Sequence, residues 1–443
     1  MTRIKFVVRE GALQGRLPVR KLARTCVAEC ALAAAALAAR RAGLVEVPAA
    51  RVDDGAVATA FLSERHLLIN DRAPVNFAPL SRFWRTADGW VRTHANYPHH
   101  RARLLDALGV PEDAAAVESA LAERSALDVE EAVYAAGGLA VALRSPEEWA
   151  AHPQAAEVAK RPLIESGRLD TARVRAFPPV GPSPLLPAAG LRVLDLTRVL
   201  AGPVATRTLA LLGADVLRLD APSLPELPDQ HADTGFGKRS ATLDLATDRQ
   251  AFEELLAAAD VVVTGYRPGA LDRFGLSAEA LAERRPGVVV AQLSAWGAYG
   301  PWRERRGFDS LVQAATGIAV LEGSAERPGA LPAQALDHGT GYLLAAAVLR
   351  ALTEQSHEGG SRFVRLALAR TAWWLMDGVA DGDAMAAGNV ENDSYDGPEP
   401  WLTQTDSVLG RLRYALSPVS FEGGPADWAR PPVSWGTDAA RWR

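Results

Sequence analysis

The chain has 443 residues, of which 48% are apolar and 23% charged, and its formal net charge at pH 7 is -5. A chain of this length can bury more than one core, so we expect two or three domains. Acidic and basic residues are mixed without a broad basic field, which argues against nucleic acid as the main partner.

The first predicted element is a long, surface-packed helix from Pro18 to Ala42. Glu29 interrupts its Ala-rich run and Arg40-Arg41 closes it, so the segment fits neither a secretory signal nor a membrane span. Its apolar residues at helical spacing share one face: Val27, Ala31, Ala34 and Leu37. We therefore expect a cytoplasmic protein that has no membrane partner.

Neither the cysteines nor the histidines have the pattern of a metal site. Cys26 and Cys30 lie four residues apart without a matching His or Cys pair, and we interpret both as core-facing small residues. His94, His99 and His100 cluster after a predicted strand with no acidic or Cys ligand at the usual spacing. We interpret that cluster as a surface loop and predict no metal.

Repeated strand and helix patterns fill the stretch from Leu191 to Leu352. The predicted strands are Arg192 to Leu196, Asp215 to Leu219, Ser240 to Leu243, Val261 to Thr264 and Val288 to Leu293. The predicted helices between them are Val204 to Leu212, Asp248 to Ala259 and Ser277 to Arg284. This spacing is typical of βαβ crossovers, so we predict an α/β fold with an open, mostly parallel sheet and helices on both faces.

Two further segments flank this region. Residues 178–187 are rich in proline and indicate a stiff, extended linker. The tail at 377–443 is rich in Gly, Asp, Pro and Trp without helical or strand period, so we predict an irregular segment that wraps the surface. Its docking residues are expected to be Trp428, Trp435 and Trp442.

Five sequence blocks follow one another in the predicted sheet region: residues 192–203, 212–220, 237–245, 265–275 and 337–341. The first is Arg-Val-Leu-Asp-Leu-Thr-Arg-Val-Leu-Ala-Gly-Pro and the last is Asp-His-Gly-Thr-Gly. Together they resemble the class III CoA-transferases, a family that includes formyl-CoA transferase, carnitine CoA-transferase, bile acid-inducible protein F and α-methylacyl-CoA racemase. Five blocks in the same order make the match specific, although each block alone is weak evidence.

The resemblance implies a Rossmann-like CoA-binding domain at 188–376 and an unusual order of the remaining segments. In the family the nucleotide-binding part begins near the amino terminus, whereas here residues 1–177 precede it. Residues 88–96 resemble the family's small-domain strand, and residues 134–153 resemble a segment near the family's end. We therefore predict a smaller α+β domain within residues 1–177 and a permuted order of the two halves.

Asp337 is the predicted nucleophile. The resemblance implies that its carboxylate attacks an acyl-CoA thioester, giving an acyl-enzyme anhydride and then an enzyme-CoA thioester. A carboxylate is ionised at neutral pH and needs no separate base. Gly339 and Gly341 are predicted to let the thioester approach a turn and to offer amide donors to the oxyanion. Without the resemblance, Asp337 is a helix N-cap, a role that is compatible with the first because a helix amino terminus stabilises an anion.

Phe308 and Asp309 separate the activities of the family. The racemase branch has a histidine base followed by an acid here, so Phe308 removes one base from that reaction. The transferase branch has an aromatic residue followed by an acid, as in this chain. Asp309 is therefore predicted to support the nucleophile, or else to cap a helix from Leu311 to Gly317.

CoA also requires phosphate contacts and a place for its adenosine. Guanidinium forks suit phosphate oxygens, although any single arginine is by default a surface charge. From their positions in the family blocks, the predicted CoA-binding residues are Arg273, Tyr266, Arg267, Lys238 and Arg239. The loop at 198–204 lacks the glycine pattern of a dinucleotide fold, so NAD and FAD are not expected. Leu200 in this loop replaces a glutamine that is frequent in the transferases.

We therefore predict an acyl-CoA:carboxylate CoA-transferase, a homodimer by resemblance, with acyl-CoA and a carboxylic acid as substrates and no permanently bound cofactor. Two alternatives remain open. A racemase-like isomerase would need a base in place of Phe308, and a non-catalytic CoA-binding subunit would bind CoA without acyl exchange. The resemblance also leaves open whether the site forms within one chain or across a dimer.

Overall fold

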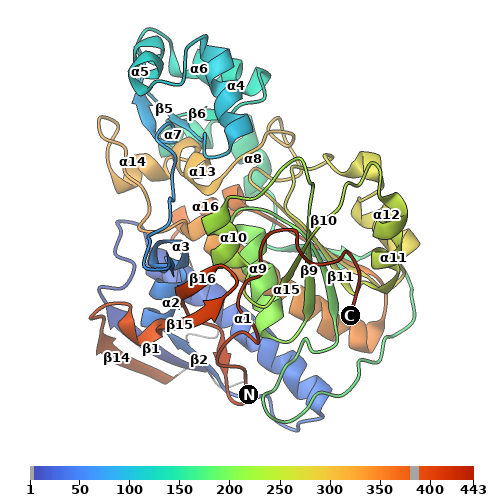
Figure 1. Cartoon of the computed structure of the whole chain (residues 1–443). Helices are drawn as coiled ribbons and strands as arrows, with labels where there is room; N and C mark the ends of the chain where they lie inside the picture. Colours follow the sequence, from blue (N-terminus) through green and yellow to red (C-terminus); the bar gives the residue numbers. More distant parts are fainter. Residues whose placement is uncertain (1–3, 380–388) are drawn as a thin grey trace.

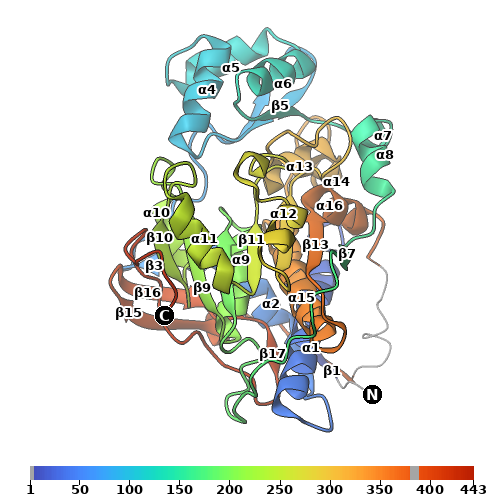
Figure 2. The same cartoon turned by 90° about the vertical axis from the view of Figure 1, so that its right-hand side faces the viewer.

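A seven-stranded sheet forms the centre of the molecule, and Figures 1 and 2 show it from two directions. The computed structural model describes residues 4–379 and 389–443. The strand order is β10-β9-β8-β11-β12-β13-β7, and only β7 at one edge is antiparallel to its neighbour. The strands are β7 (Glu165–Arg168), β8 (Arg192–Leu196), β9 (Asp215–Asp220), β10 (Arg239–Thr242), β11 (Val261–Thr264), β12 (Val289–Ser294) and β13 (Arg362–Ala367). The predicted α/β fold is confirmed.

Helices cover both faces of this sheet because its strands are apolar on both sides. Val193 of β8 packs into one core and Leu194, the next residue, packs into the other. The first core contains residues of α1 (Val19–Ala42), α9 (Ala201–Leu211) and α15 (Ala335–Glu358). The second contains residues of α11 (Arg249–Ala258) and α12 (Ala278–Arg284).

Helix α1 is not a surface helix, so that prediction was wrong. It packs along α15, and both Cys26 and Cys30 are buried. Small alanine side chains let α1 and α15 approach each other closely. Because the sequence of α1 has no strong polar face, other parts of the protein can pack around it and bury it. Within the described residues, α1 is the one helix long and apolar enough to cross a membrane, but most of that stretch is buried inside the protein.

The tail is not irregular throughout, because it contributes strands to two smaller sheets. One sheet joins β1 (Ile4–Glu10) and β2 (Ala50–Asp53) to β14 (Asn389–Ser394) and β17 (Ser420–Phe421). The other joins β3 (Leu68–Ile69) to β15 (Leu402–Ser407) and β16 (Gly410–Ala415). The prediction failed because strand β14 is polar and exposed, and its backbone pairs with β1 from the opposite end of the chain.

Three tryptophans dock the end of the tail as predicted. The indole Nε1–H groups of Trp428 and Trp442 donate to the carbonyl oxygens of Arg207 and Leu255, each at 2.8 Å. The Trp435 indole donates to the Asp220 carboxylate at 2.9 Å. These bonds hold residues 428–442 against the central sheet region. Residues 380–388 of the predicted tail lie outside the described residues.

A small α+β lobe lies at one end of the molecule (Figure 1). It contains the antiparallel strands β4 (Phe83–Arg85), β5 (Trp90–Thr93) and β6 (Ala140–Ala142), and the helices α4 (Pro98–Leu108), α5 (Ala114–Ala122) and α6 (Ala126–Ala135). The rest of residues 1–177 does not belong to this lobe, because β1 and β2 pair with the tail and β7 joins the central sheet. Residues 1–177 therefore do not form one separate domain.

The remaining helices are short and connect these layers. They are α2 (Asp54–Ala60), α3 (Ser63–His66), α7 (Pro146–Ala150), α8 (Pro153–Ala159), α10 (Pro228–Thr234), α13 (Asp309–Ala315), α14 (Ile318–Glu322) and α16 (Leu368–Met376), with 3-10 turns η1 (Asp272–Phe274) and η2 (Glu399–Trp401). Helix α3 from the amino-terminal part and helix α13 from the sheet region both reach the pocket described next.

Candidate active site

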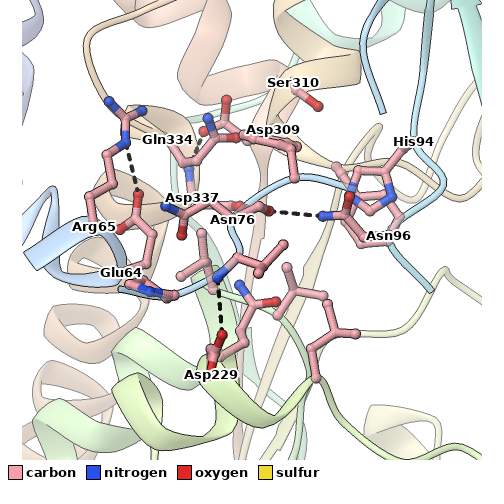
Figure 3. Close-up of a pocket in the computed structure, with 18 of the residues that line it drawn as sticks. Glu64, Arg65, Asn76, His94, Asn96, Asp229, Asp309, Ser310, Gln334 and Asp337 are labelled. Carbon is pink, nitrogen blue, oxygen red and sulfur yellow. Dashed lines mark hydrogen bonds and ion pairs between the residues drawn. The ribbon is translucent and has the colours of Figure 1, made fainter. Parts of the chain in front are cut away.

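Figure 3 shows a pocket of about 690 Å³, its open mouth included. Lining residues that follow β8 and β9 along the chain place it beyond the carboxyl ends of these strands. Ligands of open α/β sheets bind at this end of the strands. Its lining comes from residues 64–97 of the amino-terminal part and from residues 199–230 and 308–337 of the sheet region. Both parts belong to one chain, so a single chain supplies residues from both halves to this pocket.

Asp337 lies in the first turn of α15 and not in a turn before the helix. Gln334 is the N-cap residue, and the Asp337 side chain faces the pocket with the residue 6% exposed. Within residues 4–379 and 389–443, no hydrogen bond or ion pair to its carboxylate is found. Burial and the nearby charges of Asp309 and Glu64 raise the pKa of Asp337 well above its usual range.

Asp309 holds the start of α15 in place. Its Oδ2 atom accepts the backbone N–H groups of Leu336 and Asp337, both at 2.9 Å, and its other oxygen accepts from the Gln313 side chain. Two amides that a helix start leaves free are thereby satisfied by a carboxylate from another helix. Phe308, not Asp309, is the N-cap residue of α13, so the geometry favours the supporting acid over a cap of its own helix. Burial raises the pKa of Asp309 to about 6.

Glu64 brings a third acid to the pocket, from helix α3. Its Oε2 atom lies 3.2 Å from Nε2 of His338, and the His338 ring stacks on Phe61 with 5.2 Å between ring centroids. Burial opposes the charge of Glu64, but the hydrogen bond and charge of His338 outweigh it and lower the pKa of Glu64. Glu64 therefore remains anionic beside Asp337. His338 thus acts on the pocket through Glu64.

The predicted oxyanion role of Gly339 and Gly341 does not fit the structure. Both lie inside α15, where each amide donates to a carbonyl one turn earlier. A Cβ atom at Gly339 would lie 2.9 Å from Leu22 of α1, and one at Gly341 would lie 2.6 Å from the Ala201 carbonyl oxygen of α9. These glycines allow α15 to pack closely between two helices. The prediction failed because the pattern around Asp337 was interpreted as a turn.

His94 is a pocket residue that the sequence interpretation missed. It follows β5, is buried, and stacks on Phe308 with 3.8 Å between centroids and 8° between ring planes. Its Nδ1 atom is buried without a partner in the described part of the chain. Burial lowers the pKa of His94 to about 3, so its imidazole is neutral at neutral pH. The surface-loop prediction was wrong for His94 and His100, which are both buried, and Phe308 from a distant segment packs against both rings.

Other lining residues give the pocket a mixed polar and apolar wall (Figure 3). Asn96 donates from its side-chain amide to the Asn76 carbonyl at 3.2 Å, and its Oδ1 atom accepts the Ala78 N–H group at 3.0 Å. The apolar part of the wall includes Leu200, Val75 and Phe77. These contacts order the 74–78 segment of the amino-terminal part over the pocket. Among the residues described, no group of three metal-ligating side chains is found.

Arginines from four separate segments act electrostatically on one another or on His99, outside the lining of the pocket. Burial and the charges of Arg267 and Arg103 lower the pKa of Arg306, and burial with Arg198, Arg103 and Arg306 lowers the pKa of His99. We call Arg103, Arg198, Arg267 and Arg306 the arginine group. Arg198 is balanced by Glu226 at 3.6 Å, whereas Arg267 and Arg306 donate only to backbone carbonyls among the contacts found in the described residues.

The structure separates the predicted CoA-binding residues. Tyr266 lies near Arg198, a member of the arginine group, and burial raises the pKa of Tyr266. Arg273 is exposed and stacks over Phe274 at 4.6 Å, away from the pocket lining. Lys238 and Arg239 are buried and paired with Asp195 and Asp215. The geometry thus assigns those two residues a structural role in place of the predicted CoA contact.

The family model described as CoA-transferase family III matches residues 188–402. Residues 188–402 therefore belong to this family. The range that matches CoA-transferase family III contains both Asp309 and Asp337, and it starts at Ala188, directly after the predicted linker.

Two relatives with CoA-transferase names and one solved structure each match about half of the chain. An acetyl-coenzyme A transferase from Hypoxylon pulicicidum is 37% identical over 45% of this chain and 35% of its own length. A formyl-CoA:oxalate CoA-transferase from Streptomyces avermitilis is 35% identical over 56% of this chain and 64% of its own length. A crystal structure of a hypothetical protein from Mycobacterium tuberculosis is 34% identical over 43% of this chain and 57% of its own, with a TM-score of 0.39. The chain thus spans between about a third and two thirds of the lengths of these proteins.

Proposed function

We propose that the protein is an acyl-CoA:carboxylate CoA-transferase with Asp337 as its nucleophile. The position of Asp337 carries the proposal. It lies in the range matched by the CoA-transferase family III model, and its carboxylate is buried at the wall of a pocket without a partner among the described residues. A buried acid with a perturbed pKa in a pocket is the arrangement expected of a reacting group.

The reaction balances without any further reactant. A carboxylate oxygen of Asp337 attacks the thioester carbon, the C–S bond breaks, and CoA leaves as the thiolate, which gives an acyl-aspartyl anhydride. The thiolate then attacks the aspartyl carbonyl and releases the donor acid as a carboxylate. The acceptor carboxylate then attacks the aspartyl carbonyl of the resulting aspartyl-CoA thioester, which releases the CoA thiolate and gives an anhydride of the acceptor and Asp337. The thiolate attacks the acceptor carbonyl of this anhydride and gives the new acyl-CoA and free Asp337.

The charge of Asp337 controls the first step. The attacking form is the carboxylate, whereas burial, Asp309 and Glu64 raise the pKa of Asp337. The rate of acylation is therefore expected to rise as pH rises through that pKa. An anion held in a pocket with few solvating partners is also more reactive than one in water.

CoA phosphates fit the arginine group. Arg103 and Arg306 both donate to the Gly137 carbonyl, and the like charges of the arginine group lower the pKa of Arg306 and His99 after the effect of burial. Such unbalanced positive charge favours a phosphate ligand. Arg267, which the sequence predicted as a CoA-binding residue, belongs to this group. Arg103 adds a guanidinium group from the small lobe.

Donors for the oxyanion come from side chains at the pocket and not from the glycines. The backbone N–H groups of Leu336 and Asp337 already donate to the Asp309 carboxylate, so they are not available to an oxyanion. Gln334 and His94 both line the pocket, and each can present an N–H group to it. A neutral imidazole is suited to this task because it donates a hydrogen bond without first losing a proton.

The test is mass spectrometry of the protein incubated with a panel of acyl-CoAs, with and without hydroxylamine, beside Asp337→Ala. The expected result is an adduct on Asp337 that hydroxylamine converts to a hydroxamate, and no adduct in the variant. An adduct elsewhere would reject Asp337 as the nucleophile. CoA binding without any adduct or acyl exchange would favour the non-catalytic CoA-binding subunit.

One observation favours an isomerase as a second candidate. His94 stacks on Phe308, at the position where the racemase branch has its histidine, so the lost base has a neighbour that carries an imidazole. The pKa of His94, about 3 because of burial, makes it a weak base and leaves the transferase as the better-supported reaction. Incorporation of solvent deuterium at the α-carbon of an acyl-CoA, lost in His94→Ala, would reverse that preference.

A further inference from the structure

A second pocket lies near the carboxyl ends of strands β12 and β13, outside the lining of the pocket that holds Asp337. It has a volume of about 370 Å³, its open mouth included. No residue lines both pockets. Its walls come from α8 and the segment after it, from the loop that follows β12, and from the start of α16.

Three guanidinium groups line this second pocket. Arg161 follows α8 and lies over the Tyr299 ring at 3.6 Å from the ring centroid, and Arg370 of α16 donates from Nε to the Arg161 carbonyl at 2.7 Å. Arg365 of β13 donates to the Tyr299 hydroxyl at 3.2 Å. The one acid in the lining is Glu165, which accepts the Tyr299 hydroxyl and lies 3.6 Å from Arg365. The lining therefore has two more positive charges than negative ones.

Two of these guanidinium groups have donors without a partner. Arg161 Nε and Arg370 Nη1 are buried, and within the described residues neither has a hydrogen-bond acceptor. A buried N–H group of a charged side chain without an acceptor is costly, and a bound anion at the pocket that these side chains line would reduce that cost. Burial lowers the pKa of Arg370, with a smaller opposite effect from Asp377, which agrees with a guanidinium that lacks an acid partner close by.

The other side of the pocket is apolar. Its wall includes Val158, Pro162, Leu163 and Leu366. A ligand that satisfies both sides has an anionic head with planar oxygens and a short hydrocarbon body. Guanidinium forks match a carboxylate in this way, while a bare phosphate would leave the apolar wall in contact with water.

We propose that this pocket, lined by Arg161, Arg365 and Arg370, is a binding site for a small amphipathic carboxylic acid, separate from the pocket that contains Asp337. The proposal rests on the unpartnered guanidinium donors and the apolar wall, and it does not depend on the proposed reaction.

The test is calorimetric titration of the full chain with hexanoate, in the wild type and in Asp337→Ala. Both are expected to bind with the same affinity, because the nucleophile is not part of this site. Arg370→Gln is expected to weaken binding by about tenfold or more, since it removes a charged donor, and Arg370→Lys is expected to weaken it less. Arg249→Gln is the matched control, because Arg249 is an exposed arginine with its side chain 72% exposed.

Each alternative has its own outcome in this experiment. Equal hexanoate binding by wild type and Arg370→Gln would overturn the proposal. Inorganic phosphate that binds as tightly as hexanoate would mean an adventitious ion only, and competition by CoA would assign the arginines to CoA. A change of oligomeric state in Arg370→Gln, seen by sedimentation, would assign the pocket to an interface between copies of the chain. Formation of the Asp337 adduct by Arg370→Gln keeps this test separate from that of the proposed function.

Discussion

Two buried charged clusters in the sheet region differ in how completely their charges are paired. Lys238 donates from Nζ to Asp195 at 3.0 Å, to the Pro203 carbonyl at 3.0 Å and to Thr206 at 2.6 Å, so all three of its donors are used. Asp337 instead lies beside two further acids and has no partner for its carboxylate among the described residues. A buried charge whose hydrogen bonds are all made favours one folded arrangement. An unpaired charge at a pocket is instead available to bind a ligand or to react.

The largest effect that tests this comparison is expected from Asp337→Asn. Loss of the nucleophile should lower CoA-transfer by about 10⁴-fold or more, measured as initial rates with an acyl-CoA and an acceptor acid. The fold should become more stable at neutral and higher pH. A carboxyl group whose pKa is raised in the folded state contributes stability below its unfolded-state pKa, and this stability is lost as pH rises through the folded-state pKa. Asparagine stays neutral at every pH and does not lose stability in this way.

The stability part of that prediction is measured as the melting temperature of both proteins over a pH series. The advantage of Asp337→Asn is expected to grow with pH. A difference in melting temperature that is the same at every pH would mean that the folded structure does not disfavour the charged form of the Asp337 carboxyl. Wild-type activity of the variant would reject the nucleophile altogether.

Lys238→Met probes the paired cluster. It leaves the Asp195 carboxylate buried without its cation and is expected to destabilise the fold by about 3–5 kcal/mol, measured by denaturant unfolding. Lys238→Met with Asp195→Asn should recover part of that loss, because the uncompensated charge is removed. A stable Lys238→Met protein with weakened CoA binding would restore the CoA-contact role that the sequence predicted.

Gly341→Ala and Gly339→Ala test whether the glycines pack helices or assist the reaction. Each is expected to destabilise the protein by about 1–3 kcal/mol in denaturant unfolding. Gly341→Ala should cost more, because its Cβ would meet the Ala201 backbone oxygen at 2.6 Å, whereas at Gly339 the Leu22 side chain can move. Unchanged stability with a fall in kcat of about 10²–10³ would instead restore the oxyanion role.

The smallest effect is expected from Asp309→Asn. Asparagine can still accept a hydrogen bond from the start of α15, but it removes a charge that raises the pKa of Asp337. The acid limb of the pH–rate profile should therefore move to lower pH, with little change of the rate at high pH. A loss of rate at every pH would show that the Asp309 charge is needed for the position or reactivity of Asp337.

Local pattern was sufficient to predict five of the seven strands of the central sheet, whereas β7 and β13 were not predicted. Strand β11 was predicted with its exact bounds, and β8 likewise, because each buried strand is a short apolar run between clear helical periods. Helix α9 begins at Ala201, three residues before its prediction, since its first turn contains Gly202 and Pro203, which are usually found at helix ends. The permuted order of the halves, the homodimer and the cytoplasmic location remain predictions.

Contacts between distant segments decided what was missed. Phe308, far along the chain, stacks on His94, and β14 pairs with β1 from the opposite end of the chain. Glu64 was missed because no local motif marks an acid that reaches the pocket from a short helix. The spacing of residues along the sequence does not show which distant segments will contact one another in the fold.

The sequence alone determined the βαβ order, the family blocks and the choice of Asp337, because hydrophobic period and motif are properties of neighbouring residues. Only the tertiary structure decided that Asp337 lies in the first turn of α15 with Asp309 on its amides, that Gly339 and Gly341 pack helices, and that His94 and Glu64 complete the pocket wall. The physical reason is that burial, and with it the pKa of each acid, is created by segments that meet only in the folded chain.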